Sequence, residues 1–289
     1  MSKEYRPEID ISPVLTPSQH AYYQSLIGML CWMVELGRVD ICLEVSMLSS
    51  HLAMPREGHL QQALHIFGYL DKHSNAAMVF DPTPWKVPED KFAKKDWKYS
   101  IYGCEGMEEE LPSDMPTPLG ESMRLRVYVD SDHAGDQVTR RSRTGFIVYL
   151  NNAPIYWFSK RQTSCETSTY GSEFIAMKQA CEYVRGLRYK LRMMGIRVDE
   201  PAYVFGDNQS VLANTENTGS VLKKKTSAIS YHFVREGCCR DEWRTAYINT
   251  HENIADLLTK PLTDINKRWR FIATMLLWVA PSRYYVDAS

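Results

Sequence analysis

Four acidic residues lie at places where predicted strands end or predicted helices begin. Asp130 ends an apolar strand that begins at Leu125, and Asp207 follows another that begins at Ala202. Glu173 lies in the first turns of a long predicted helix, and Asp256 lies in a short one. If the two strands are neighbours in a sheet, we expect Asp130, Glu173 and Asp207 to converge within about 8 Å, with Asp256 on the rim.

Carboxylates that converge repel one another unless a divalent cation neutralises them. Hard oxygen ligands suit Mg²⁺ or Mn²⁺, and two such ions about 4 Å apart suit cleavage of a phosphodiester bond. Any one of these acids could instead be a surface charge or a helix cap. Asp207, directly before Asn208, could cap a helix in this way. The four acids together therefore predict a metal-dependent phosphodiesterase, and each acid alone leaves a structural role open.

The residues around these acids predict a mixed α/β arrangement. A long helix is expected over 167–194, with an apolar residue at every third or fourth position, and short helices over 209–215, 229–237 and 253–259. Asn151-Asn152 indicates a tight hairpin between two strands. The five predicted strands are Leu125–Val129, Thr144–Leu150, Ala153–Phe158, Ala202–Phe205 and Trp243–Ile248. This order predicts a mixed sheet with helices on both faces.

The N-terminal part, up to about residue 80, reads as mainly helical. Thr16 followed by Pro17 is typical of a helix start, and Pro55 ends a second helical stretch. Another helix is predicted over Gly58–His73 and a short strand over Ala77–Phe80. No cluster of titratable residues in this part calls for a chemical explanation.

Length and charge divide the chain into unequal parts. Its 289 residues allow about two domains, and its net charge of −1 excludes a uniformly basic nucleic-acid coat protein. Residues 123–262 hold 20 bases and 15 acids, a surplus that suggests an anionic ligand or only a solvated surface. Residues 81–122 hold ten acids, five bases and six prolines, which is typical of a linker. We therefore predict a helical segment 1–80, an acidic linker 81–122, a domain 123–262 and a C-terminal helix and tail 263–289.

Nothing in the sequence predicts a membrane segment or a secreted protein. No apolar run reaches the roughly 18 residues that span a bilayer. Residues 1–20 are polar and lack a signal peptide pattern. The seven cysteines contain no CxxC pair, and we interpret them as reduced thiols of an intracellular protein.

Seven short motifs follow one another along the predicted α/β domain. They are Tyr128–Asp136 (YVDSDHAGD), Arg141–Phe146 (RSRTGF), Ile155–Gln162 (IYWFSKRQ), Ser168–Ala176 (STYGSEFIA), Asp207–Val211 (DNQSV), Ser230–Glu236 (SYHFVRE) and Asn253–Leu262 (NIADLLTKPL). In this order they resemble the ribonuclease H domain of copia-type LTR retrotransposon Pol polyproteins. Upstream, Tyr23–Leu30 and Arg38–Ile41 resemble the C-terminal end of the same family's reverse transcriptase. The resemblance covers roughly residues 15–80 and 123–262, and the acidic segment between them is longer than the family would predict.

The resemblance implies a ribonuclease H-like fold and a metal-dependent endonuclease that hydrolyses the RNA strand of RNA–DNA hybrids, with two Mg²⁺ or Mn²⁺ ions. It assigns the catalytic and metal-binding positions to Asp130, Glu173, Asp207 and Asp256. Asp132 is a second or alternative acid, and His251 is either a candidate proton shuttle or a loop histidine. Where the family usually has a histidine before the helix with Tyr231, this chain has Thr226 and Ser227.

The sequence also lacks the Tyr-x-Asp-Asp pair with which polymerases hold their metals. We therefore expect no polymerase activity, and the remainder of the reverse transcriptase is a candidate partner. The alternative is an inactive retroelement remnant that only binds nucleic acid or has a structural role.

Contacts to the substrate backbone are predicted for basic residues near the acids, because phosphate contacts dominate affinity for nucleic acids. These residues are Arg140, Arg141, Arg143, Lys160 and Arg161, with Lys223, Lys224 and Lys225 as a further basic run.

Overall fold

The computed structural model describes residues 5–103, 108–222 and 228–278 and divides into two compact units. One unit contains the chain up to Val79, Asp136–Val138 and the residues from Lys260 onward. The other contains Phe80–Gly135 and Thr139–Thr259. This division by contacts differs from the limits that we predicted from composition. Those limits therefore remain a proposal.

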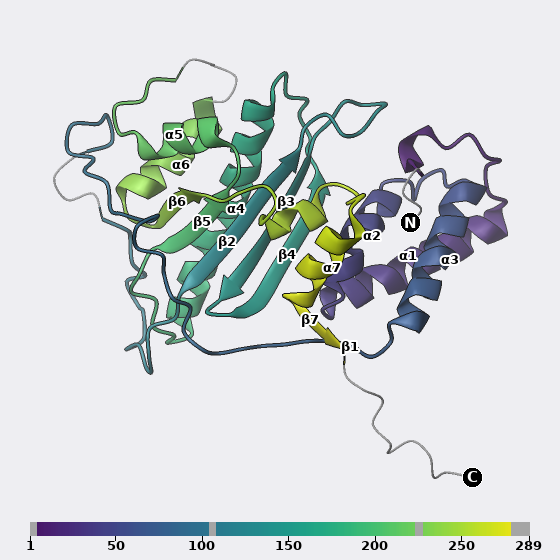
Figure 1. Cartoon of the computed structure of the whole chain (residues 1–289), viewed down its shortest axis with the longest axis horizontal. Coiled ribbons are helices and arrows are strands. Elements are labelled where there is room, and N and C mark those ends of the chain that lie inside the picture. The colour runs from purple at the N-terminus through teal and green to yellow at the C-terminus, as the bar shows by residue number, and fades with distance from the viewer. Residues whose placement is uncertain (1–4, 104–107, 223–227, 279–289) are drawn as a thin grey trace, which may run out of the picture. The chain divides into compact units, whose positions relative to one another are not determined.

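The second unit is built on a five-stranded mixed sheet (Figure 1). Its strand order is β4-β3-β2-β5-β6, in which β2 is antiparallel to β3 and parallel to β5. The strands are β2 (Leu125–Asp132), β3 (Arg143–Leu150), β4 (Ala153–Arg161), β5 (Ala202–Gly206) and β6 (Trp243–Tyr247). The predicted fold class, an α/β mixed sheet of five strands with flanking helices, is confirmed.

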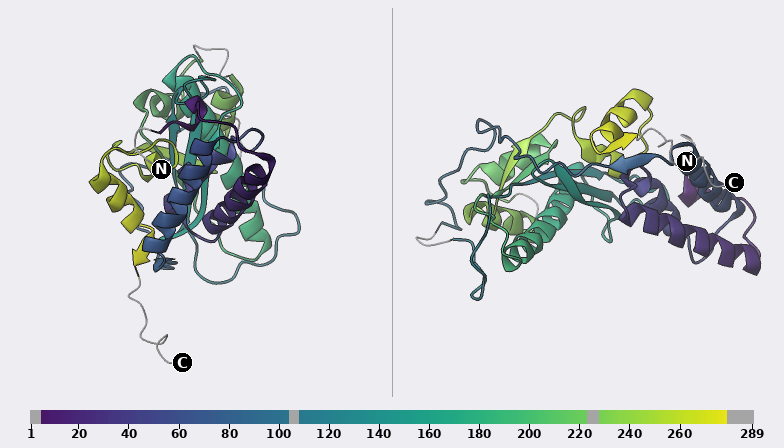
Figure 2. Two further views of the ribbon diagram at one scale, coloured as in Figure 1. Left: turned by 90° about the vertical axis from the view of Figure 1, so that its right-hand side faces the viewer. Right: turned by 90° about the horizontal axis from the view of Figure 1, so that it is seen from below.

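Helices pack on the sheet and form an apolar core with it, as the spacing of apolar residues in the sequence predicts. The long helix α4 (Thr169–Met193) lies along one face of the sheet (Figures 1 and 2), where Phe174, Ala180 and Val184 are fully buried against β2 and β3. The remaining helices of this unit are α5 (Gln209–Glu216), α6 (Ala228–Cys239) and the short 3-10 helix η4 (Ile254–Leu258). The hairpin at Asn151 has a positive φ of 55°, which asparagine tolerates better than most residues.

The segment interpreted as a linker packs against this unit. Phe92 lies 4.9 Å, ring to ring, from both Tyr203 and Phe205 of β5, and Trp85 packs beside it. The guanidinium of Arg235 on α6 lies 4.9 Å from the ring centre of Trp97. Through these contacts, residues 80–103 pack against strand β5 and helix α6.

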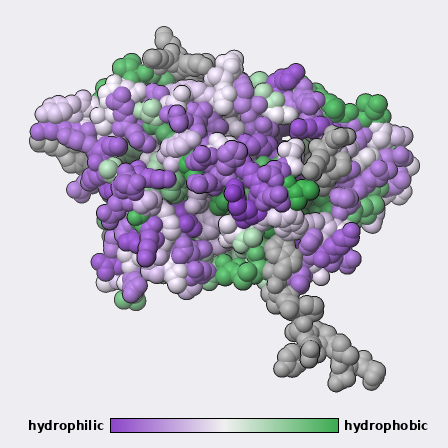
Figure 3. All heavy atoms as spheres, in the orientation of Figure 1, coloured by the Kyte–Doolittle hydropathy of each residue, from purple (hydrophilic) through white to green (hydrophobic). Residues whose placement is uncertain are grey.

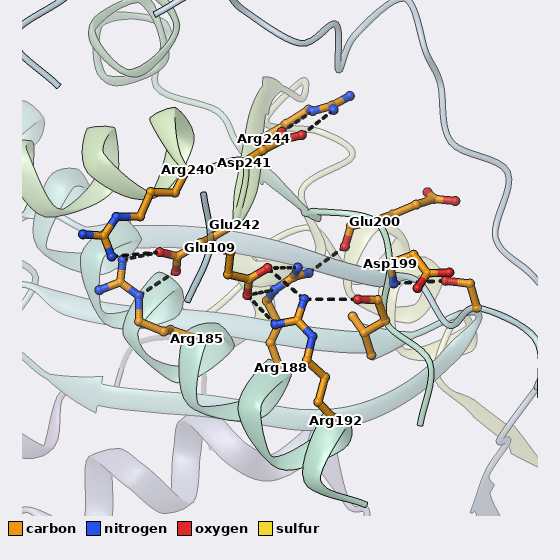
Figure 4. Close-up of polar contacts among 12 residues, drawn as sticks. Glu109, Arg185, Arg188, Arg192, Asp199, Glu200, Arg240, Asp241, Glu242 and Arg244 are labelled. Atoms are coloured by element: carbon orange, nitrogen blue, oxygen red, sulfur yellow. Dashed lines mark hydrogen bonds and ion pairs between the residues drawn. The ribbon is translucent and has the colours of Figure 1, made fainter. Parts of the chain in front are cut away.

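Further along the same acidic segment, Glu109 forms a buried ion-pair cluster with two arginines of α4 (Figure 4). The Glu109 carboxylate accepts two hydrogen bonds from Arg188 and two from Arg192, at 2.6–2.8 Å. Both arginines come from α4 and are almost fully buried. Burial alone would raise the pKa of Glu109, but the two guanidinium groups lower its pKa to about 2. The carboxylate is therefore charged at neutral pH and strongly held.

The first unit combines both ends of the chain. Its N-terminal part forms η1 (Pro7–Ile9), α1 (Pro17–Glu35), η2 (Val39–Ile41), α2 (Cys42–Ser49), α3 (Glu57–Lys72) and β1 (Ala76–Met78). Its C-terminal part forms α7 (Ile265–Ala273) and β7 (Leu276–Trp278). Thr16 caps α1, as the sequence predicts, and Gln19 completes the capping box.

Two contacts join these distant parts of the chain within the first unit. Strand β7 pairs antiparallel with β1, with Ala76 opposite Trp278. Arg268 of α7 forms an ion pair with Glu44 at 3.0 Å and donates to the Asp40 carbonyl at 2.8 Å. The C-terminal helix therefore completes a fold that the N-terminal helices begin.

Among the described residues, no helix is long and apolar enough to cross a membrane. On the face shown in Figure 3, hydrophilic residues dominate and hydrophobic ones occur in small separate groups. The six cysteines of the described part are free thiols.

Candidate active site

Three of the four predicted acids converge at one edge of the sheet. Strands β2 and β5 are parallel neighbours, so their carboxyl ends bring Asp130 and Asp207 together. Ligand oxygens of Asp130, Glu173 and Asp207 all lie within 4.8 Å of one another. Two charges at this distance repel by about 3 kcal/mol at an effective dielectric constant of about 20. The predicted convergence of these three acids is confirmed.

Glu173 is positioned by the start of α4. The Ser168 side chain caps the helix by accepting from the backbone N–H of Gly171, which places Glu173 in the second turn. Buried Gln162, directly after β4, donates from Nε2 to the Ser172 carbonyl at 3.0 Å and to Thr144 Oγ1 at 3.1 Å. The first turns of α4 are thus tied to the sheet, and Glu173 is buried beside Asp130.

Asp207 is not the cap of the following helix. The N-cap of α5 is Asn208, whose Oδ1 accepts from the Val211 N–H at 3.1 Å. The Asp207 carboxylate instead accepts a hydrogen bond from Thr250 Oγ1 at 2.9 Å. Of the two roles that the sequence left open for Asp207, the structure therefore favours the one in the carboxylate cluster.

This assignment predicts a difference in stability between two neighbouring residues. Asn208→Ala removes the N-cap of α5 and is expected to lower the free energy of unfolding by about 1 kcal/mol. Asp207→Asn removes no cap and should cost no stability. Urea unfolding of both variants measures the difference, and an equal loss in the two would contradict the assignment.

Asp256 differs from its predicted position. It was expected on the rim of the site, but it is fully buried in η4 and lies outside the group of three acids. The rim prediction is wrong because the segment Asn253–Thr259 packs directly onto β2 and β3 and carries Asp256 inward. Thr259, at the end of this segment, donates its hydroxyl hydrogen bond to Asp130 Oδ2.

Two further residues were considered from the sequence. Asp132 is the last residue of β2 and is partly buried, outside the group of three. His251 is exposed and follows Thr250, the partner of Asp207, in the loop after β6. The role of His251 as a proton shuttle remains a prediction.

Most of the predicted substrate-binding residues lie at the same end of the sheet as Asp130. In the β3–β4 hairpin, Arg143 is paired with Arg161, and Thr144 with Lys160. Arg143 is also opposite Asp132 at the carboxyl end of β2. Arg140 and Arg141 are exposed in the loop that leads into β3. The basic run Lys223–Lys225 and the pair Thr226 and Ser227 fall outside the described residues.

Sequence reasoning missed the hydroxyl groups that hold the acids. Thr250 and Thr259 contact Asp207 and Asp130, and Asn253 donates from Nδ2 to the Val129 carbonyl at 2.9 Å. A signal for Thr259 existed, because it lies three residues after Asp256 within one of the recognised motifs. That spacing alone does not reveal which acid a hydroxyl contacts.

The chemistry of the donor set fits a divalent cation. Asp130, Glu173 and Asp207 offer only carboxylate oxygens, which are the hard ligands that Mg²⁺ and Mn²⁺ prefer. Asp130 and Glu173 are buried and Asp207 is partly exposed, so the cluster keeps one side open. A divalent cation would offset the repulsion that the three charges otherwise generate.

No protein-family model matches the chain. Over 241 residues, 83% of its length, it is 29% identical to the retrovirus-related Pol polyprotein from transposon RE1 of Arabidopsis thaliana. Over 238 residues it is 26% identical to the corresponding polyprotein from transposon TNT 1-94 of Nicotiana tabacum. The chain spans only 14% and 15% of these two relatives.

Among solved structures, the chain is similar to LC11-RNase H1 in complex with an RNA/DNA hybrid. The sequence identity is 16% and the TM-score 0.39, with 47% of this chain and 94% of the other covered. Together with the motifs above, the relatives found over most of its length show that the chain is a homologue of the Pol polyproteins of copia-type plant retrotransposons.

Proposed function

We propose that the unit containing the sheet is a metal-dependent ribonuclease H that hydrolyses the RNA strand of RNA–DNA hybrids. The observation that carries this proposal is the convergence of Asp130, Glu173 and Asp207 within 4.8 Å at the carboxyl ends of two parallel strands. Homology to Pol polyproteins supports it, because copying RNA into DNA creates hybrids whose RNA strand must be removed.

In this proposal Asp130, Glu173 and Asp207 hold two Mg²⁺ or Mn²⁺ ions, and Asp256 supports the site from its buried position. When bound, such ions activate the attacking water and stabilise the leaving 3′ oxygen. The chain's own part is to fix the carboxylates: Thr250 orients Asp207, and the start of α4 orients Glu173. The products would carry a 5′-phosphate.

The test is cleavage of matched RNA–DNA, RNA–RNA and DNA–DNA duplexes with and without Mg²⁺. The expected result is cleavage of the RNA strand of the hybrid alone, abolished by a chelator. The second candidate is an inactive remnant that only binds nucleic acid, for which the hybrid would be bound but left intact in Mg²⁺ and in Mn²⁺. Polymerase activity is not expected from this chain.

Binding of the hybrid is proposed to use the basic residues around the β3–β4 hairpin. Replacing Arg140, Arg141 and Arg143 together by Ala should weaken binding and flatten the dependence of log affinity on log salt concentration. The slope should fall by up to about three units, because each neutralised phosphate contributes roughly 0.9 on a B-form duplex and similarly here. The rate at saturating substrate should change less, since these side chains position the duplex.

Affinity measured at several salt concentrations checks this expectation. A triple variant with an unchanged slope would show that these arginines only coat the surface. Lys223, Lys224 and Lys225 would then be the next candidates for contacts to the phosphate backbone. The remainder of the reverse transcriptase is proposed as a partner, and an intracellular site of action stays a prediction.

A further inference from the structure

The segment around η4 is attached to strand β2 at two buried points. Asn253 caps η4 and donates from Nδ2 to the Val129 carbonyl at 2.9 Å. Six residues later, at the other end of η4, Thr259 Oγ1 donates to Oδ2 of Asp130. Asn253 and Thr259 are 0% and 1% exposed, so water does not compete for either contact. The segment is therefore hydrogen-bonded to the end of β2 by residues on both sides of Asp256 in the sequence.

The hydroxyl of Thr259 has a choice of two acceptors, and the geometry favours Asp130. The backbone carbonyl of Asp256 lies 3.3 Å from the same Oγ1, at the long end of the hydrogen-bond range. A hydroxyl has a single proton to donate. A carboxylate is the stronger acceptor, so the proton is directed to Asp130.

Gly145 makes room for this contact. It lies directly opposite Asp130 in the β2–β3 register. A Cβ at this position would lie 2.5 Å from Thr259 Cγ2 and 2.9 Å from Leu258 Cβ, closer than real Cβ contacts come. The backbone of Gly145 does not require glycine, because its φ is not positive. The absent side chain is what lets Thr259 reach the sheet.

We propose that Thr259 is a positioning residue of the acidic cluster: its hydroxyl fixes the orientation of the Asp130 carboxylate toward Glu173 and Asp207. This inference rests on the proposed metal-dependent function. A hydrogen bond from the Thr259 hydroxyl to Oδ2 restricts the rotation of the Asp130 carboxylate about its side-chain bonds. Partners of metal ligands typically change metal affinity or activity by 10- to 100-fold when removed.

The test measures binding of Mn²⁺ alone to the full chain, followed by electron paramagnetic resonance of the free ion. Thr259→Val keeps the shape and removes the hydroxyl, and it should weaken Mn²⁺ binding by about 10- to 100-fold. Thr259→Ser keeps the hydroxyl and should restore binding to within about threefold of the wild type. In the cleavage assay, Thr259→Val should lower kcat and leave KM for the hybrid unchanged, since no substrate contact is lost.

Two further variants keep the inference falsifiable. Gly145→Ala would place a Cβ 2.5 Å from Thr259 Cγ2 and should therefore push Thr259 away from Asp130. It should weaken Mn²⁺ binding by a similar factor and tests the contact independently of Thr259→Val. Thr215→Val is the matched control, because it removes another fully buried hydroxyl, 2.7 Å from Thr245 Oγ1 and away from the acids. It should change stability without changing Mn²⁺ affinity.

The outcomes separate this inference from the proposed function. Wild-type Mn²⁺ affinity in Thr259→Val or in Gly145→Ala overturns the positioning role alone, and so does failure of Thr259→Ser to restore binding. A wild-type chain that binds Mn²⁺ but cleaves no hybrid overturns the proposed function while the affinities still test Thr259. A wild-type chain that binds no Mn²⁺ overturns both.

Discussion

Replacing Asp207 by Asn is expected to lower the rate of RNA-strand cleavage by about a thousandfold or more, because the stabilisation that a bound metal supplies to the transition state is worth several kcal/mol. The same change should leave the melting temperature of the metal-free protein unchanged or raise it. The cause is relief of repulsion, since Asp207 lies within 4.8 Å of two other carboxylates and caps no helix. Single-turnover cleavage and thermal unfolding in a chelator measure the two effects.

A matched control for this change is Asp199→Asn. Asp199 lies in the same unit, but its side chain is 52% exposed and pairs with Arg197 at the surface. It should retain both activity and stability, because exposed ion pairs contribute little. A large loss of stability in Asp207→Asn would instead assign Asp207 a structural role.

The second large effect is expected at Glu109. Glu109→Gln leaves the guanidinium groups of Arg188 and Arg192, with side chains only 2% and 8% exposed, without a compensating charge. Breaking a buried pair by removing one partner typically costs about 3–5 kcal/mol. We therefore expect a loss of stability of this order in urea unfolding, with the neighbouring exposed Glu110→Gln as the control close to wild type. A Glu109→Gln variant as stable as Glu110→Gln would show that the ion pairs of Glu109 with Arg188 and Arg192 add no stability.

Glu109 also predicts how stability depends on pH. Its pKa is lowered from 4.5 to about 2 in the folded chain, so its contribution is complete above about pH 4.5. That contribution is lost as the pH falls from about 4.5 toward 2, and it amounts to about 3 kcal/mol. Unfolding of wild type and Glu109→Gln between pH 2 and 6 should therefore show curves that converge in acid. Curves that stay parallel over this range would contradict the lowered pKa.

The elements of the sheet could be predicted from the sequence because their signals are local. Short apolar runs mark the strands, and the long helix expected over 167–194 is α4 at Thr169–Met193. The convergence of Asp130 and Asp207 followed from one assumption, that their strands are neighbours, and the parallel pair β2–β5 satisfies it.

The remaining features depend on contacts between distant residues. Trp85 and Phe92 have no periodic spacing, so the composition around them indicated a linker although both rings pack against β5. Asp256 is buried because its segment packs on β2 and β3, where Leu258 and Thr259 approach Gly145 closely, and no local pattern encodes that approach. Asp207 and Asn208 are adjacent and both can cap a helix, so only the hydrogen bond to Val211 distinguishes them.

The pairing of β1 with β7 has a consequence for the order in which the chain folds during synthesis. The N-terminal helices emerge before the unit containing the sheet, but the residues that complete their own unit, from Lys260 onward, emerge after it. At 5–20 residues per second the intervening stretch of roughly 180 residues takes about 10 to 40 s to synthesise. During that interval Glu44 lacks Arg268, and the edge of β1 lacks its partner strand. The last residue of the unit containing the sheet is Thr259. This unit can therefore fold on the ribosome before the residues that complete the first unit have been synthesised.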